Sequence, residues 1–174
     1  MKTVEIKVYS YDGLSEAAKE KAREWYSDCD SDWQFEWECV CGDAKKVGLN
    51  IESLGDARRD CRGAFTEDAL EVAKKIMQGH GKDCATFKTA DAYTAKVEEL
   101  DKKFPLYGQD DSPYDFECEQ EKEGLDDDFL GELLSDYYGM MVDSAEEARS
   151  RERVEENIRA NDYQFTEDGK IYRG

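Results

Sequence analysis

Hydrophobic residues recur along most of the chain at the three- and four-residue spacing that is typical of amphipathic helices. This spacing predicts helices in six segments, 15–28, 32–47, 66–78, 89–104, 125–141 and 144–158. Residues that favour helix ends support these boundaries: Ser15, Gly48, Thr66, Thr89 and a capping box formed by Ser144 and Glu147.

Apolar and polar residues alternate in three further segments, which is the pattern of strands with one buried face. These segments are 3–9, 49–51 and 116–121, and turn residues predict hairpins at 55–63 and 163–172. We therefore expect a single α+β domain over residues 1–174, with a small, mainly antiparallel sheet packed against about six helices.

The segment 110–147 dominates the charge of the chain. It holds fifteen acidic residues and one basic residue, Lys122, so its net charge is −14 out of −19 for the whole sequence. Regularly spaced leucines, phenylalanines and tyrosines accompany the acids, which favours a folded segment over a solvated tail. Folding would hold the carboxylates at fixed positions relative to one another.

The expected geometry of these carboxylates is a strand followed by a helix. Alternation between Phe116 and Glu121 predicts a strand that displays carboxylates on one face, roughly 6.6–7 Å apart. The helix that follows adds carboxylates four residues apart on its outer face. The candidate partner-binding residues are Glu117, Glu119, Glu121, Asp126, Asp127, Asp128, Glu132, Asp136, Tyr137 and Tyr138.

Tyrosines border the acidic residues, and a tyrosine beside a carboxylate suits an interface with an arginine-rich partner. They are Tyr107, Tyr114, Tyr137 and Tyr138. The alternative is that these side chains are partly buried at the edge of the core. The same alternative applies to the carboxylates, which could form a solvated face and nothing more.

Composition limits the classes of partner. A net charge of −19 disfavours direct binding to nucleic acid or to an anionic membrane, so we expect basic protein partners. The N-terminal residues lack the apolar centre of a signal peptide, and no apolar run approaches the ~18 residues of a membrane span. These features predict a cytoplasmic protein whose six cysteines are reduced and serve as small buried side chains.

Few residues suggest catalysis or metal binding, and we expect neither a catalytic site nor a cofactor. The one histidine, His80, lies in a Gly-His-Gly-Lys turn and is predicted to be a solvent-exposed loop residue. Cys39 and Cys41 are too close to form half of a structural zinc site. With 43 acidic residues, carboxylate pairs such as those used in glycoside hydrolysis are common by composition alone and indicate no enzyme. Trp25, Trp33 and Trp37 have helical spacing and are predicted to be core residues.

The two ends of the chain resemble a family of small bacteriophage and prophage accessory proteins. The N-terminal motif is YSYDGLSEAAKEKA, from Tyr9 to Ala22, followed by Trp25 and Tyr26, and the C-terminal motif is IRANDYQFTEDG, from Ile158 to Gly169. This resemblance covers roughly the first 50 and the last 20 residues. It implies a phage-encoded protein of the bacterial cytoplasm that is directed at host machinery or defence.

Together these observations predict an anti-CRISPR or anti-restriction type inhibitor. Its fixed carboxylates would imitate the phosphates of a nucleic acid and occupy the basic cleft of a host defence protein. The alternative is a phage binding module that recognises another host protein through an apolar patch and uses its acids only for solubility.

Overall fold

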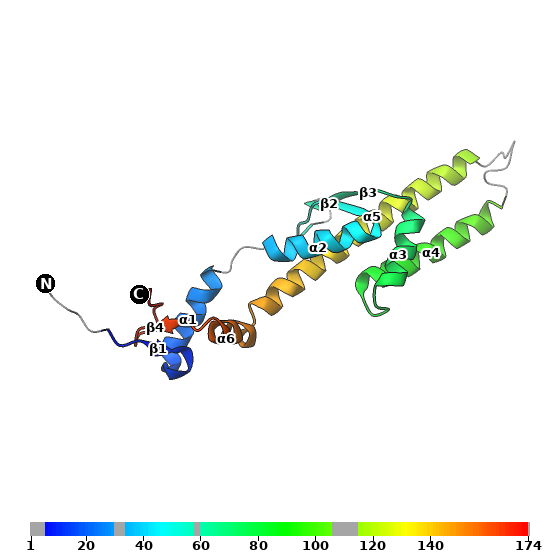
Figure 1. The fold of residues 1–174 in the computed structure, drawn as a ribbon. Helices are drawn as coiled ribbons and strands as arrows, with labels where there is room; N and C mark the ends of the chain where they lie inside the picture. The colour runs from blue at the N-terminus through cyan, green and yellow to red at the C-terminus, as the bar shows by residue number, and fades with distance from the viewer. Residues whose placement is uncertain (1–5, 30–33, 58–59, 106–114, 174) are drawn as a thin grey trace. The chain divides into compact units, whose positions relative to one another are not determined.

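The computed structural model describes residues 6–29, 34–57, 60–105 and 115–173. In these residues the chain forms six α-helices, one short 3-10 helix and two antiparallel sheets of two strands each (Figure 1). The helices are α1 (Glu16–Cys29), α2 (Gln34–Val47), α3 (Ala69–Gly79), α4 (Ala85–Lys103), α5 (Asp115–Ala148) and α6 (Arg151–Ala160). The strands are β1 (Tyr9–Ser10), β2 (Leu49–Ser53), β3 (Arg62–Phe65) and β4 (Gln164–Phe165). The predicted α+β class is confirmed, although two separate sheets replace the single expected one.

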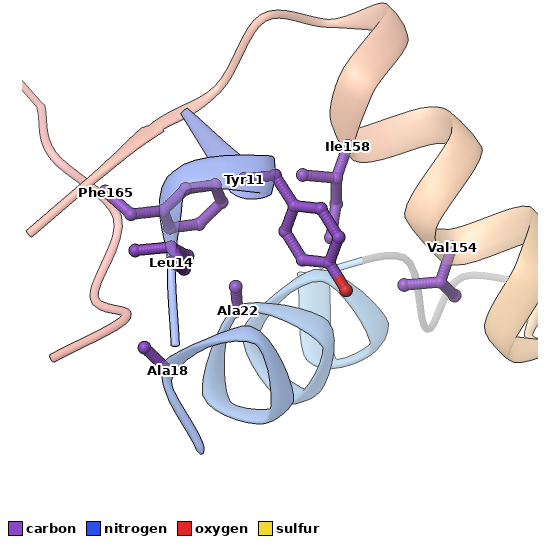
Figure 2. Packing of buried hydrophobic residues seen from close by; sticks show 7 residues of the cluster. All are labelled: Tyr11, Leu14, Ala18, Ala22, Val154, Ile158 and Phe165. Atoms are coloured by element: carbon purple, nitrogen blue, oxygen red, sulfur yellow. The ribbon is translucent and has the colours of Figure 1, made fainter. Parts of the chain in front are cut away.

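The chain divides into two compact units, one formed by Met1–Glu36 with Asp143–Gly174 and the other by Trp37–Val142. The first unit, here the terminal unit, joins the two ends of the sequence. Strand β1 pairs with β4, and α1 packs on α6. Figure 2 shows the core of this unit, in which Tyr11 and Phe165 lie against small residues of α1 and apolar residues of α6.

A buried arginine links the helices of the terminal unit. The guanidinium of Arg23 donates to the Tyr11 hydroxyl at 2.7 Å and to Glu155 at 2.9 Å, and it also pairs with Glu20. Because Arg23 lies in α1 and Glu155 in α6, this ion pair fixes two segments that are 132 residues apart in sequence. A buried charge is tolerated only when it is paired in this way.

The second unit, here the central unit, contains β2, β3, α3, α4 and the greater part of α5. Strands β2 and β3 pair as a hairpin, and the predicted hairpin segment 55–63 contributes only Arg62 and Gly63 to its strands. Gly48 ends α2 with a φ of +93°, a conformation that glycine adopts readily. The aromatic ring of Phe129 in α5 stacks on Tyr93 in α4, with 4.1 Å between the ring centroids. Helix α5 thus contributes a large part of the core on which the central unit is built.

The predicted strand at 116–121 is wrong, because these residues form the first turns of α5. Two apolar residues are too few to distinguish a strand from a helix. In the structure Phe116 is 71% exposed, whereas Cys118 is buried together with Leu100 of α4 and with Phe104, which follows that helix. Cys118, Leu125 and Phe129 follow a helical spacing, and the intervening glutamates and glutamine favour a helix.

Three predicted helix starts are wrong, because a residue other than the predicted one precedes each helix. Asp68 caps α3 through a bond from the Leu70 N–H, while the Thr66 hydroxyl donates to the Gly48 carbonyl instead. Helix α4 begins after Cys84 and not at Thr89. Ser150 caps α6, since its hydroxyl accepts from the Arg153 N–H, and the residues of the predicted capping box lie inside the end of α5. The predicted cap at Ser15 is confirmed by a bond from the Ala18 N–H.

Three further predictions concern the N-terminal strand, the cysteines and the number of domains. The predicted strand at 3–9 lies partly outside the described residues, and of residues 6–9, which are described, Tyr9 alone belongs to a strand. Among the described cysteine side chains, Cys118 is buried as predicted, but Cys39 and Cys84 are exposed. The expectation of a single domain over residues 1–174 stays a prediction.

Candidate functional site

Helix α5 carries thirteen acidic residues and one basic residue over its 34 positions. At 3.6 residues per turn, residues four, seven and eleven positions apart fall on nearly the same side of a helix. One set of exposed carboxylates that meets this condition is here called the acidic line: Glu117, Glu121, Asp128 and Glu132. They lie within an arc of about 60° and extend over about 22 Å of the helix axis. A shorter row of exposed carboxylates four residues apart, Glu119, Glu123 and Asp127, lies on another side of α5.

The helical conformation changes the predicted arrangement of the first glutamates. Residues two positions apart point to opposite sides of a helix, about 200° apart. Glu119 therefore does not share a face with Glu117 and Glu121, and the predicted row of these three residues is wrong. Glu119 and Asp127 are exposed, but they lie outside the acidic line.

Two of the candidate carboxylates are engaged inside the central unit. Asp126 accepts a hydrogen bond from the hydroxyl of Tyr93, and Asp136 accepts one from the hydroxyl of Thr89 at 2.7 Å. Burial raises the pKa of Asp136, and the nearby Glu132 raises it further, while the bond from Thr89 opposes both effects. These two carboxylates are partly exposed and bind α4 through hydrogen bonds, so they have an internal role that the sequence did not predict.

Tyr137 is also internal, because its side chain is fully buried. Its hydroxyl donates to Asp43 of α2 at 3.0 Å. A residue in this position cannot anchor a partner on the surface, whereas the neighbouring Tyr138 is half-buried and remains accessible. The other two tyrosines that border the acidic residues in sequence, Tyr107 and Tyr114, lie outside the described residues.

An open groove lies beside the acidic line, between α4 and α5, with a volume of about 410 Å³. Its apolar residues are Leu100 and Leu125, which pack together with Phe104 and Cys118. Its charged residues are Lys96, Glu99, Lys103, Glu121 and Asp128, and an ion pair between Lys103 and Glu121 joins the two helices. Sequence reasoning missed this groove, because it depends on which residues of two separate helices face each other.

His80 is not the solvent-exposed loop residue that was predicted, because only 11% of its side chain is exposed. Its Nε2 lies 3.2 Å from the Asp43 carboxylate, and its Nδ1 lies 2.8 Å from the Thr86 hydroxyl. Both ring nitrogens are thus engaged, and Thr86 is fully buried. A hydroxyl that no substrate can reach is not a nucleophile, so this cluster acts as a structural link between α2 and the α3–α4 connection.

Two further kinds of feature, metal centres and membrane-spanning helices, were sought in the described part of the chain. It contains no group of three or more histidine, cysteine or acidic side chains arranged to hold a metal ion. None of its helices is both long and apolar enough to cross a membrane.

The comparisons with known proteins add no assignment. No protein-family model, no curated protein and no solved structure matches this chain. Function is therefore inferred from the geometry of α5 and its neighbours.

Proposed function

We propose that this protein is a phage-encoded inhibitor that binds a basic, nucleic-acid-binding defence protein of the bacterial host, such as a CRISPR effector or a restriction enzyme. The acidic line of α5 takes the place of the phosphate backbone in the partner's basic cleft. The observation that carries this proposal is the alignment of four exposed carboxylates on one side of one continuous helix.

A helix holds its carboxylates at fixed positions relative to one another, and imitation of a nucleic acid requires such fixed charges. Glu117 and Glu121, like Asp128 and Glu132, are four residues apart and thus separated by about 6 Å along the axis. Duplex DNA carries one charge per ~1.7 Å of axis, so the acidic line is sparser than a duplex and would match only selected basic residues of a cleft. The rigidity of the helix offsets part of the affinity lost through the wider charge spacing, because less conformational entropy is lost on binding.

The charges of the acidic line differ in their surroundings. Glu121 pairs with Lys103, whose side chain is 57% exposed, so a partner arginine could displace it at little cost. Further exposed carboxylates on other sides of α5 raise the negative potential around the line without being part of it. Such a field accelerates the encounter with a basic partner and weakens as salt is added.

The test compares two variants that remove the same amount of charge. The first neutralises the acidic line with Glu117→Gln, Glu121→Gln, Asp128→Asn and Glu132→Gln. The control neutralises four exposed acids on other helices and on the C-terminal segment, with Asp91→Asn, Glu98→Gln, Glu152→Gln and Glu167→Gln. Each purified protein is immobilised, host lysate is passed over it at rising salt, and captured proteins are identified by mass spectrometry.

Under the proposal, the wild-type protein and the control variant retain a nucleic-acid-binding protein that added DNA or RNA displaces. The line variant should lose this capture by about tenfold or more, which corresponds to about 1.4 kcal/mol or more of binding free energy. Capture that persists at high salt and ignores nucleic acid contradicts the proposal. Equal loss in both variants also contradicts it, because net charge and not alignment would then govern binding.

A further inference from the structure

The groove between α4 and α5 combines an apolar floor with charged edges. Leu100 forms part of the buried core of the central unit, whereas Leu125 is only partly buried and faces the groove. The long sides of the groove are two packed helices, joined by the Lys103–Glu121 ion pair and by the bond between Tyr93 and Asp126. An open apolar floor between fixed helices is the form of surface into which a partner inserts an anchoring side chain.

Gly124 keeps this groove open from the α5 side. It lies within the helix and lines the groove, and a Cβ atom placed on it would meet no neighbouring heavy atom within 4 Å. Packing therefore does not demand glycine at this position, although glycine is unfavourable in the interior of a helix. Gly139 in the same helix is equally free of close neighbours but does not line the groove, so it provides a matched control.

The charges around the groove restrict its occupant. On the α5 side the edge is formed by Glu121 and Asp128, which belong to the acidic line. The α4 edge carries Lys96, Glu99 and Lys103, and Lys103 pairs with Glu121. An occupant therefore meets two carboxylates on the α5 edge and is favoured if it carries lysine or arginine on that side. A second copy of the chain or an anionic membrane is disfavoured, because each protein molecule carries a net charge of −19.

We infer that the α4–α5 groove binds a basic amphipathic segment of the partner protein, with an apolar side chain between Leu100 and Leu125 and its lysines or arginines against α5. This inference rests on the proposed function and adds to it an apolar anchor beside the acidic line. Electrostatic attraction then guides the encounter, and the buried anchor slows dissociation.

The test uses Gly124→Leu, which fills the groove, and Gly139→Leu as its control. The probe is a short amphipathic peptide of lysine and leucine, and a second peptide of the same length and charge has alanine in place of leucine. Affinities are measured by isothermal titration calorimetry, and the methyl resonances of Leu100 and Leu125 are followed by NMR. An added Cβ meets no heavy atom within 4 Å at either position, and leucine is more favourable than glycine inside a helix, so both variants should fold and melt at a temperature no lower than the wild type.

The wild-type protein and Gly139→Leu should bind the leucine peptide about tenfold or more tightly than the alanine peptide. In Gly124→Leu this preference should disappear, while the weaker, charge-driven binding of the alanine peptide persists. Shifts of the Leu100 and Leu125 methyl signals should accompany binding of the leucine peptide in the wild type.

Equal affinity for the two peptides overturns the inference, as does an unchanged preference in Gly124→Leu. Self-association of the wild type that Gly124→Leu abolishes, measured by sedimentation, would assign the groove to a second copy instead. The failure of this inference is distinguishable from failure of the proposed function. If the line variant loses the host partner and Gly124→Leu keeps it, the acidic line acts without the groove.

Discussion

Replacement of Tyr137 by phenylalanine separates an internal role of this residue from a role in partner binding. The Tyr137 side chain is fully buried, and its hydroxyl donates to the Asp43 carboxylate at 3.0 Å. Burial raises the pKa of Tyr137, and the negative charge of Asp43 raises it further, so the hydroxyl keeps its proton and remains a donor at neutral pH. The Tyr137→Phe variant removes this one bond and retains the ring in the core.

The stability that Tyr137→Phe loses depends on the contacts that the Asp43 carboxylate keeps in the variant. A hydrogen bond to a charged group contributes about 1.5–3 kcal/mol. Because Asp43 retains its contact with His80 at 3.2 Å, its carboxylate is not left unpaired, and the lower end of that range applies. We expect the central unit to lose about 1.5 kcal/mol of unfolding free energy, which lowers a urea midpoint by roughly 0.5–1.5 M.

Hydrogen exchange detected by mass spectrometry provides the assay, because it reports the stability of the central unit separately from the terminal unit. Peptides from β2, β3 and α4 should exchange faster in Tyr137→Phe, while those from α1 and α6 should be unaffected. The control is Tyr138→Phe at the adjacent half-buried position, with an expected change within about 0.5 kcal/mol. If Tyr137→Phe leaves exchange unchanged but weakens capture of the host protein, the internal role of Tyr137 is refuted.

Two further predictions concern the terminal unit. Burial raises the pKa of Glu155, but hydrogen bonds from Arg151, Tyr11 and Arg159 outweigh this effect and lower it from the ordinary 4.5 to about 2. A depressed pKa stabilises the fold above pH 4.5 and this contribution is lost as the pH falls toward 2, so Glu155→Gln should flatten the acid limb of a thermal stability profile. Gly169→Ala should destabilise the unit by at least about 1 kcal/mol in thermal unfolding, because a positive φ disfavours alanine. That φ is +84°, and the added Cβ would lie 2.2 Å from the Ala18 carbonyl oxygen. Unchanged stability in Gly169→Ala would show that this turn can move.

The sequence predicted the helices better than their ends. Long amphipathic segments such as α1 and α4 repeat the helical spacing over several turns, so their existence is clear from the pattern. Helix ends depend on single side chains, and several serines, threonines and aspartates compete for each cap. Asp68 is the cap in place of Thr66, and Ser150 in place of Ser144, because the backbone leaves the helix at those residues.

The sequence predicted the acidic character of the candidate site but not its internal contacts, because those contacts join residues that are far apart in the sequence. The acidic character of α5 is local in sequence, so it could be read from composition. The internal contacts are not local: Tyr137 meets Asp43 across 94 positions, and Asp136 meets Thr89 across 47. No periodicity within one segment identifies such pairs, and for this reason the sequence pattern does not show that Asp126, Asp136 and Tyr137 are engaged within the central unit.

The remaining question is whether the acidic line is more than a solvated face. Solubility requires surface charge but not its alignment, and aligned like charges four residues apart destabilise a helix by a few tenths of a kcal/mol per pair. Neutralisation of the line removes these repulsions and also the exposed Lys103–Glu121 ion pair, so the unfolding free energy of the central unit should change by less than about 1 kcal/mol. A solvated face would tolerate this change without loss of binding, whereas a binding surface would not. The line variant and its control of equal charge thus distinguish the two roles, whichever host protein the partner is.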